Sequence, residues 1–158
     1  MTRISRYGVA AELPTGWSGE VYTRTPSRRA GDPTTGAAAT TPPVLHAASF
    51  PLPPERGDFG GGAVELMAAA DGFVALFEYD RSSASKALFS AQGVPGPLGP
   101  YDFHAQALQR PRAVQVGCQR FFNTQGRAFC LYVVLGSDRY ASAILGHTNG
   151  LLRSLTIT

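Results

Sequence analysis

Seven consecutive apolar residues constrain the fold more than any other feature of this sequence. The segment from Phe129 to Leu135 reads FCLYVVL and contains no charged or amide side chain. A strand with one wet face alternates apolar and polar residues, whereas a strand covered on both faces does not. The segment is also far shorter than the roughly 20 residues that span a bilayer. It therefore predicts a central strand with a packed layer on each side of its sheet.

The size and composition of the chain predict one folded domain. Its 158 residues, 44% of them apolar and 16% charged, are enough to bury a core. We expect a single soluble domain over residues 1–158, without insertion into a membrane. The formal charge is +3, but the arginines are scattered, with local clusters only at Arg28–Arg29 and at Arg110 and Arg112. Nucleic-acid binders concentrate basic residues on one face, so no nucleic-acid partner is expected.

The N-terminal residues bear on the cellular compartment. No apolar segment follows Arg3 and Arg6, as one would in a signal peptide. If Met1 is the native start, the expected location is the cytoplasm. If a leader has been removed, the protein is secreted or is a lipoprotein.

Strand-like segments alternate with turn signals in the first third of the chain. Strands are expected at residues 4–13, 19–23 and 44–50, with a turn at PTG (14–16) between the first two. Residues 24–43 are rich in Pro, Gly, Thr and Ala and have no apolar period. Such a composition cannot offset its ordering entropy, which predicts a long flexible loop.

Two hairpins are expected in the remainder. Asp71-Gly72 separates AVELMAA (63–69) from FVALFEY (73–79), and Asp-Gly between two apolar runs is a strong hairpin signal. The second hairpin joins residues 114–123 to residues 127–136 through a turn at 124–126.

Two helices complete the predicted topology. A short one covers residues 82–90, with Ser82 or Ser83 as its N-cap, and a longer one runs from about 138 to 153. The closing SLTIT (154–158) is expected to be an edge strand. The order of elements predicts an α+β fold, with a largely antiparallel β-sheet sandwiched by helices.

Cys118 and Cys130 are the two cysteines of the chain. With a three-residue turn at 123–125 they would lie directly opposite each other, so a cross-strand disulfide is conceivable and would fit an oxidising compartment. The alternative is two buried thiols that act as small apolar residues. Zinc is not expected, because the pair lacks Cys-x-x-Cys spacing and a nearby histidine.

Glu65 and Glu78 form the arrangement closest to catalytic chemistry. A two-residue turn in the first hairpin places them opposite each other, where like charges are destabilising. One explanation is a carboxylate pair in which one pKa is raised for acid/base chemistry. A second is an arginine between them, either Arg120 or Arg127. A third is a different register, with a longer loop.

The other polar residues give no catalytic, metal or cofactor motif. His46, His104 and His147 lie in three separate elements, and each is expected to be a surface or core residue. The run Gly60–Gly62 leads into a predicted strand, so it lacks the helix N-terminus that phosphate sites use. It is interpreted as a flexible connection. No catalytic residue, metal or cofactor is expected.

Two ends of the chain carry a family resemblance. The strand leading into LPTGW (13–17), and the closing helix followed by LRSLTI (152–157), resemble the PsbP-like superfamily. That group includes a photosystem II extrinsic subunit, a Ran-GTPase release factor, DcrB and LpqN-type lipoproteins, and Eag-type secretion chaperones. As a pattern of elements the resemblance covers the whole chain, although Gly60–Gly62 and residues 24–43 depart from it. It implies a central antiparallel sheet between helices, no catalysis, and partner proteins bound by a sheet face or a groove.

The sequence therefore favours a non-catalytic protein-binding adaptor, assembly factor or effector chaperone. The candidate partner-binding residues are Trp17, Phe121, Phe122 and Arg120, and the three aromatic side chains among them need not all fit inside. One alternative is a structural subunit of a larger secretion or phage-like assembly. Another is a small-molecule-binding or hydrolytic protein that uses Glu65 and Glu78.

Overall fold

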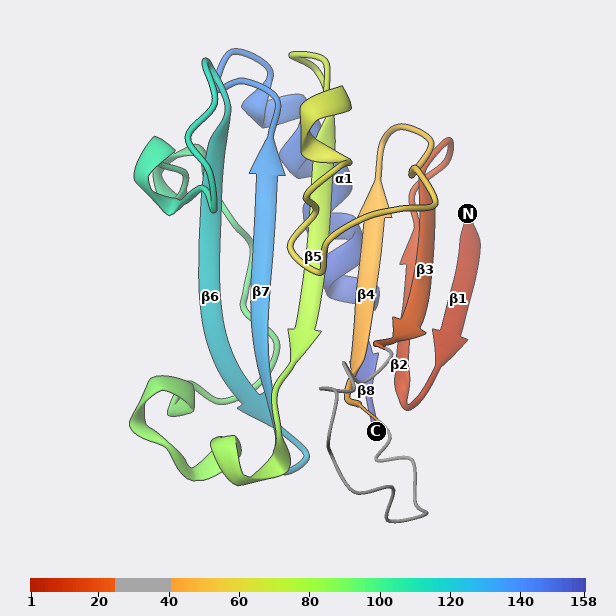
Figure 1. The fold of residues 1–158 in the computed structure, drawn as a ribbon, viewed down its shortest axis with the longest axis vertical. Coiled ribbons are helices and arrows are strands. Elements are labelled where there is room, and N and C mark those ends of the chain that lie inside the picture. Colours follow the sequence, from red (N-terminus) through yellow and green to blue (C-terminus); the bar gives the residue numbers. More distant parts are fainter. Residues whose placement is uncertain (25–40) are drawn as a thin grey trace, which may run out of the picture.

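Two antiparallel sheets form the frame of the computed structural model, which describes residues 1–24 and 41–158 (Figure 1). In spatial order the larger sheet contains β3 (Ser18–Thr23), β4 (Pro43–Ala48), β5 (Gly72–Glu78), β7 (Arg127–Leu135) and β6 (Val116–Thr124). The smaller sheet contains β1 (Thr2–Arg6), β2 (Val9–Leu13) and β8 (Thr156–Ile157). One α-helix, α1 (Ala141–Ser154), is described. Most of the predicted loop at 24–43 lies outside the described residues.

The prediction of a strand covered on both faces is confirmed. β7 lies between β5 and β6, and all nine of its residues are buried. Its odd-numbered side chains from Phe129 to Leu135 pack in the core that contains Ile144 and Leu151 of α1. Its even-numbered side chains, such as Tyr132 and Val134, belong to apolar clusters on the other face. Continuous apolar sequence therefore corresponds to two separate packing layers.

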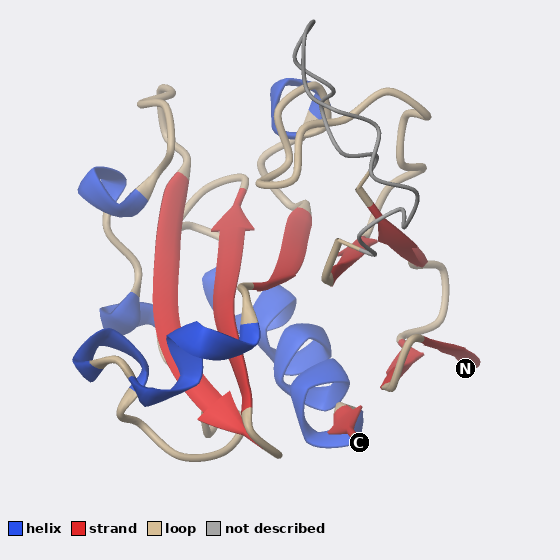
Figure 2. Ribbon diagram, turned by 60° about the horizontal axis from the view of Figure 1, so that its bottom comes forward, coloured by secondary structure: helices blue, strands red, loops and turns tan. Residues whose placement is uncertain are grey.

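The prediction that helices cover both faces of the sheet is wrong. α1 packs against one face, and Figure 2 shows only short helical turns elsewhere among the described residues. The opposite face is covered by the irregular segment 49–71, whose side chains Phe50, Leu52, Phe59 and Met67 pack on it. This segment contains three prolines and four glycines. Proline and glycine disfavour a helix, so its apolar side chains reach the sheet from loops and one 3₁₀ turn, Val64–Leu66.

The predicted hairpin at 63–79 is also wrong. β5 pairs with β4 on one side and β7 on the other, and residues 63–69 form no strand. Asp71 is a turn residue whose carboxylate accepts hydrogen bonds from Ala68 N and Ser49 Oγ, both at 2.8 Å. At Gly72 a Cβ atom would lie 2.6 Å from Ile144 Cγ2. Glycine is needed there for close approach of the sheet to α1, and not for a hairpin turn.

The second hairpin is confirmed, with a shorter turn than expected. β6 and β7 pair from Thr124–Arg127 outward, so the loop contains only Gln125 and Gly126. Both have positive φ, 54° and 71°, as a type I′ turn requires. The strand pairing therefore differs by three positions from the pairing that a turn at 123–125 would give.

Among the remaining predicted elements, two differ from the prediction and the two at the C-terminus are confirmed. The segment 4–13 is two strands, because Tyr7 and Gly8 turn with φ of 54° and 77°. The segment 82–90 forms two 3₁₀ turns, Arg81–Ser85 and Ala87–Phe89, without a side-chain cap. The C-terminal helix is confirmed over Ala141–Ser154, and the closing edge strand is confirmed as β8, which pairs with β2. None of the described helices is long and apolar enough to cross a membrane.

A buried ion pair joins the two sheets. Arg127, at the start of β7, binds Glu78 at the end of β5, and each is 5% exposed. The same guanidinium donates to Tyr7 O at 3.1 Å and Gly8 O at 3.3 Å in the β1–β2 turn, and to Thr158 O at 2.9 Å beyond β8. One buried charge therefore satisfies carbonyl groups of the smaller sheet and a carboxylate of the larger one.

Removing one member of this pair should destabilise the fold strongly. Glu78→Gln leaves the Arg127 charge buried without its counter-charge, and we expect the free energy of unfolding to fall by about 3–5 kcal/mol in urea titrations. The exposed Glu55→Gln is the matched control and should change it by less than about 0.5 kcal/mol. The double variant Glu78→Leu/Arg127→Met should lower the free energy of unfolding by less than Glu78→Gln does, because it leaves no unpaired buried charge. Equal stability of Glu78→Gln and the control would show that the pair does not hold the sheets together.

Candidate binding pocket

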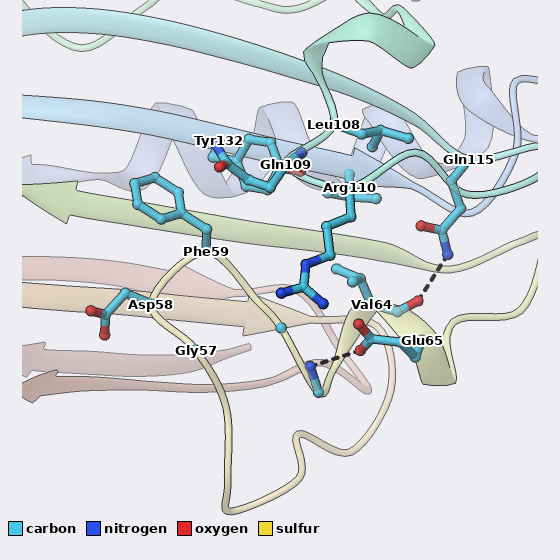
Figure 3. A pocket seen from close by; sticks show the side chains of 13 residues that line it. Gly57, Asp58, Phe59, Val64, Glu65, Leu108, Gln109, Arg110, Gln115 and Tyr132 are labelled. Carbon is cyan, nitrogen blue, oxygen red and sulfur yellow. Dashed lines mark hydrogen bonds between the residues drawn. The ribbon is translucent and has the colours of Figure 1, made fainter.

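A pocket of about 500 Å³ lies on the face of the larger sheet opposite α1 (Figure 3). Tyr132 and Val134 of β7 contribute to it from the sheet, and Phe59, Val64 and Leu108 give it further apolar lining. Its other lining residues are Gly57, Asp58, Gly61, Gly62, Glu65, Gln109, Arg110 and Gln115. The cavity thus combines an apolar interior with a few polar groups, the composition of a typical ligand pocket.

Two irregular segments, 57–66 and 108–115, form the walls. Buried Gln115 donates from Nε2 to Val64 O at 2.8 Å, which ties one wall to the other. Tyr132 Oη accepts a hydrogen bond from Gln109 N at 2.9 Å, which fixes the second wall to β7. Both contacts join segments far apart in the sequence, so the pocket exists only once the sheet has formed.

The run Gly60–Gly62 has a structural explanation in this wall. Gly60 and Gly62 have φ of 90° and 92°, a conformation that L side chains rarely adopt. A Cβ atom at Gly60 would also lie 2.5 Å from the ring of Phe73. Gly62 N donates to Glu65 Oε2 at 2.7 Å. The predicted flexible connection is therefore a hydrogen-bonded turn packed on the sheet, and it leads into a 3₁₀ turn instead of a strand.

Apolar side chains near the pocket point to solvent. Leu66 and Val114 are 62% and 72% exposed, and each is close in sequence to lining residues. Val114 has φ of 62°, an outlier for a β-branched residue. Strain of this kind costs about 1–3 kcal/mol and clusters at binding sites and ligand clamps.

A buried histidine anchors the pocket wall to β4. His46 is 0% exposed, and its Nδ1 accepts a hydrogen bond from Arg56 Nε at 3.0 Å. Since Arg56 can only donate, the imidazole proton is on Nε2, which donates to Asp58 O at 2.8 Å. Burial lowers the pKa of His46 from 6.5 to about 4, and the nearby Arg56 charge acts in the same direction. His46 is therefore neutral and holds the segment that leads into the pocket.

Polar side chains on β3 extend this network. Tyr22 Oη donates to Asp58 Oδ1 at 2.9 Å, and burial raises the pKa of the Tyr22 phenol. Arg56 also forms an ion pair with Glu20. Arg24 Nε lies 3.9 Å from Asp58 Oδ2. Together these contacts fix residues 56–58 over the outer strands, and they leave Gly57 and Asp58 at the edge of the pocket.

The buried neutral histidine predicts a loss of stability in acid. The unfolded chain takes up a proton on His46 near pH 6.5 and the folded one only near pH 4. Its contribution is therefore complete above pH 6.5 and is lost as the pH falls toward 4. We expect a decrease of roughly 3 kcal/mol over that window by urea unfolding.

His46→Gln removes the titrating group, so its stability should depend less on pH over the same window. In NMR spectra the His46 ring of the unmodified protein should titrate near pH 4. A ring that titrates near 6.5 would contradict this explanation, whether or not the variant folds.

The structure separates the predicted carboxylate pair. Glu78 is buried against Arg127, whereas Glu65 is exposed, lines the pocket and binds Gly62 N. The two do not face each other, because the Asp71-Gly72 hairpin that would align them does not form. Of the two arginines expected to lie between the carboxylates, Arg127 binds Glu78 but not Glu65. Arg120 binds Asp102 at 2.8 Å instead.

The four predicted partner-binding residues do not form one surface. Phe122 is 1% exposed and stacks on Phe129, so it is a core residue. Trp17 is half-buried against the α1 core, whereas Phe121 packs with an aromatic cluster on the other face. Arg120, a residue of β6, is partly exposed and paired with Asp102. Partner binding through any one of them stays a prediction.

The disulfide that the sequence made conceivable does not form. Cys118 pairs with Val133 and Cys130 with Phe121, so the two cysteines are three positions out of register and on opposite faces of the hairpin. Both are free and buried, and burial raises the pKa of the Cys130 thiol to about 11. This is the alternative in which the thiols act as small apolar residues. The two-residue turn at Gln125-Gly126 is the reason.

Sequence reasoning missed the pocket residues Phe59, Leu108 and Tyr132. They lie in three separate segments, and no local pattern marks them. Each histidine is expected to be a surface or core residue, and the structure places His46 in the core and His104 and His147 on the surface. Within residues 1–24 and 41–158, no three His, Cys, Asp or Glu side chains gather as a metal site would require.

Comparisons with protein-family models, with curated proteins and with solved structures give no significant match to this chain. The PsbP-like resemblance therefore stays a prediction.

Proposed function

We propose that this protein is a non-catalytic binding module, an adaptor or assembly factor, that holds a segment of a partner protein in the pocket between residues 57–66 and 108–115. The observation that supports this proposal is the pocket itself, about 500 Å³ of partly apolar space on one face of the sheet. Its volume lies in the range of about 300–1,000 Å³ that is usual for ligand sites.

The exposed side chains near the pocket favour a protein over a small molecule. A small ligand is buried mainly by the cavity, whereas a protein segment also covers the surface around it. Leu66 and Val114 would lose their exposed apolar surface under such a segment. The strained backbone of Val114 holds its side chain in solvent, where it contributes little to the free fold.

The polar groups of the pocket suit binding better than catalysis. Glu65 is exposed and bonded to a backbone amide, and the nearby His46 is enclosed by Arg56 and Asp58. A general base lies within hydrogen-bond reach of the nucleophile that it activates, and neither Glu65 nor His46 has such a neighbour among its hydrogen-bond partners. The predicted PsbP-like resemblance implies the same class of function.

Filling the pocket should abolish partner binding without unfolding the protein. Gly61 lines the pocket, its φ is not positive, and a Cβ atom there meets nothing within 4 Å. Peptides selected from a phage-displayed library should protect residues 57–66 and 108–115 from hydrogen exchange, and Gly61→Trp should remove their binding. The matched control is Gly96→Trp, which also meets open space but does not line the pocket. Selected peptides that protect another surface and bind Gly61→Trp normally would refute the proposed function.

Relieving the backbone strain at Val114 should increase the stability of the protein and weaken its binding of peptides. Val114→Gly suits the positive φ, so the free energy of unfolding should rise by about 1 kcal/mol. Binding of the selected peptides should weaken, because an apolar contact near the pocket is removed. Leu88, 59% exposed in a different segment, provides the control Leu88→Ser, which should leave binding unchanged. Unchanged peptide affinity in Val114→Gly would show that this side chain lies outside the binding surface.

A further inference from the structure

The wall segment 108–115 carries two arginine side chains without acidic partners. Arg110 lines the pocket, and its guanidinium extends beside the cavity toward Glu65 (Figure 3). Arg112 is exposed two residues further along the same wall. Among residues 1–24 and 41–158, no carboxylate lies within 4.0 Å of either guanidinium, although four other arginines do form ion pairs.

The carboxylates of the pocket have other partners. Glu65 Oε2 accepts a hydrogen bond from Gly62 N at 2.7 Å. Asp58 accepts one from Tyr22 at 2.9 Å and has Arg24 at 3.9 Å. Arg110 beside the partly apolar cavity, and Arg112 two residues further along the same wall, therefore present guanidinium donors that no carboxylate of the described chain satisfies.

We propose that the segment bound in this pocket is acidic: an apolar side chain enters the cavity, and neighbouring carboxylates accept hydrogen bonds from Arg110 and Arg112. This inference rests on the proposed function and names the chemistry of its partner. A guanidinium matches a carboxylate with two parallel hydrogen bonds, which gives orientation as well as attraction. The apolar contact supplies affinity, and the charge supplies selectivity and faster association.

A peptide suits this surface better than a nucleic acid. Nucleic-acid binding needs a continuous basic track and exposed aromatic faces for the bases. Here the basic groups are two neighbouring arginines, and the aromatic ring of Phe59 already stacks on Phe77 with centroids 4.9 Å apart. The cavity beside them fits a side chain held by a short acidic segment.

Three matched fluorescent peptides test the inference. Each has the same central Leu-Phe pair, flanked by glutamate and aspartate in the first, glutamine and asparagine in the second, and lysine in the third. By fluorescence anisotropy, the acidic peptide should bind about fivefold or more tightly than the neutral one, and the lysine peptide should bind weakest. The preference should shrink as salt increases. A single-stranded oligonucleotide is included as a competitor.

Variants identify the residues responsible. Arg110→Gln should reduce the preference for the acidic peptide, and Arg110→Glu should reverse it in favour of lysine. Arg3→Gln, an equal loss of charge on β1 in the other sheet, should leave it unchanged. Reversal by Arg110→Glu supports the inference even if absolute affinities are low.

Each contrary outcome has a distinct meaning. Equal binding of the three peptides at the pocket would overturn the acidic preference and leave the proposed function standing. An oligonucleotide that displaces the acidic peptide and depends on Arg110 would assign the arginines to a nucleic acid. Failure of both these and the phage-selected peptides to bind at the pocket would overturn the proposed function as well.

Discussion

Burial of β7 on both faces is the constraint on which the rest of the structure depends. All nine of its residues are buried, so each face of the sheet needs its own apolar layer. Only one α-helix is described, and it covers one face. The other face receives its cover from segments 49–71 and 105–115, which contain little regular structure. The asymmetry of the two layers explains why the pocket lies on the face opposite α1.

Loop segments that cover a sheet need hydrogen bonds from side chains, whereas a covering helix does not. Backbone groups in a helix bond to one another, whereas loop backbone over a sheet must find other partners. His46 binds Asp58 O, Gln115 binds Val64 O, and Tyr132 accepts from Gln109 N. These three contacts hold both pocket walls, so the groups that complete the fold also shape the cavity.

Buried charge plays a similar part between the sheets. Arg127 satisfies Glu78 and three carbonyl groups of the smaller sheet and C-terminal strand region, a role for which a planar guanidinium with five donors is suited. His46 differs, because it is buried neutral with a pKa near 4. Both groups serve the architecture, whereas Arg110 at the pocket is exposed and has no carboxylate within 4.0 Å among the described residues.

Sequence alone determined the elements whose signals are local. The unbroken apolar run of β7, the apolar stripe of α1 and the antiparallel hairpin at 116–135 were all predictable, since periodicity reports how many faces are covered. Tertiary structure decided what covers them. Asp71-Gly72 has the sequence of a hairpin turn, but Gly72 is needed for close packing against Ile144. The two-residue turn of the β6–β7 hairpin sets a register in which Cys118 and Cys130 are not opposite each other. The pocket joins segments about 50 residues apart, Val64 and Gln115 among them, and contacts at that separation leave no local pattern.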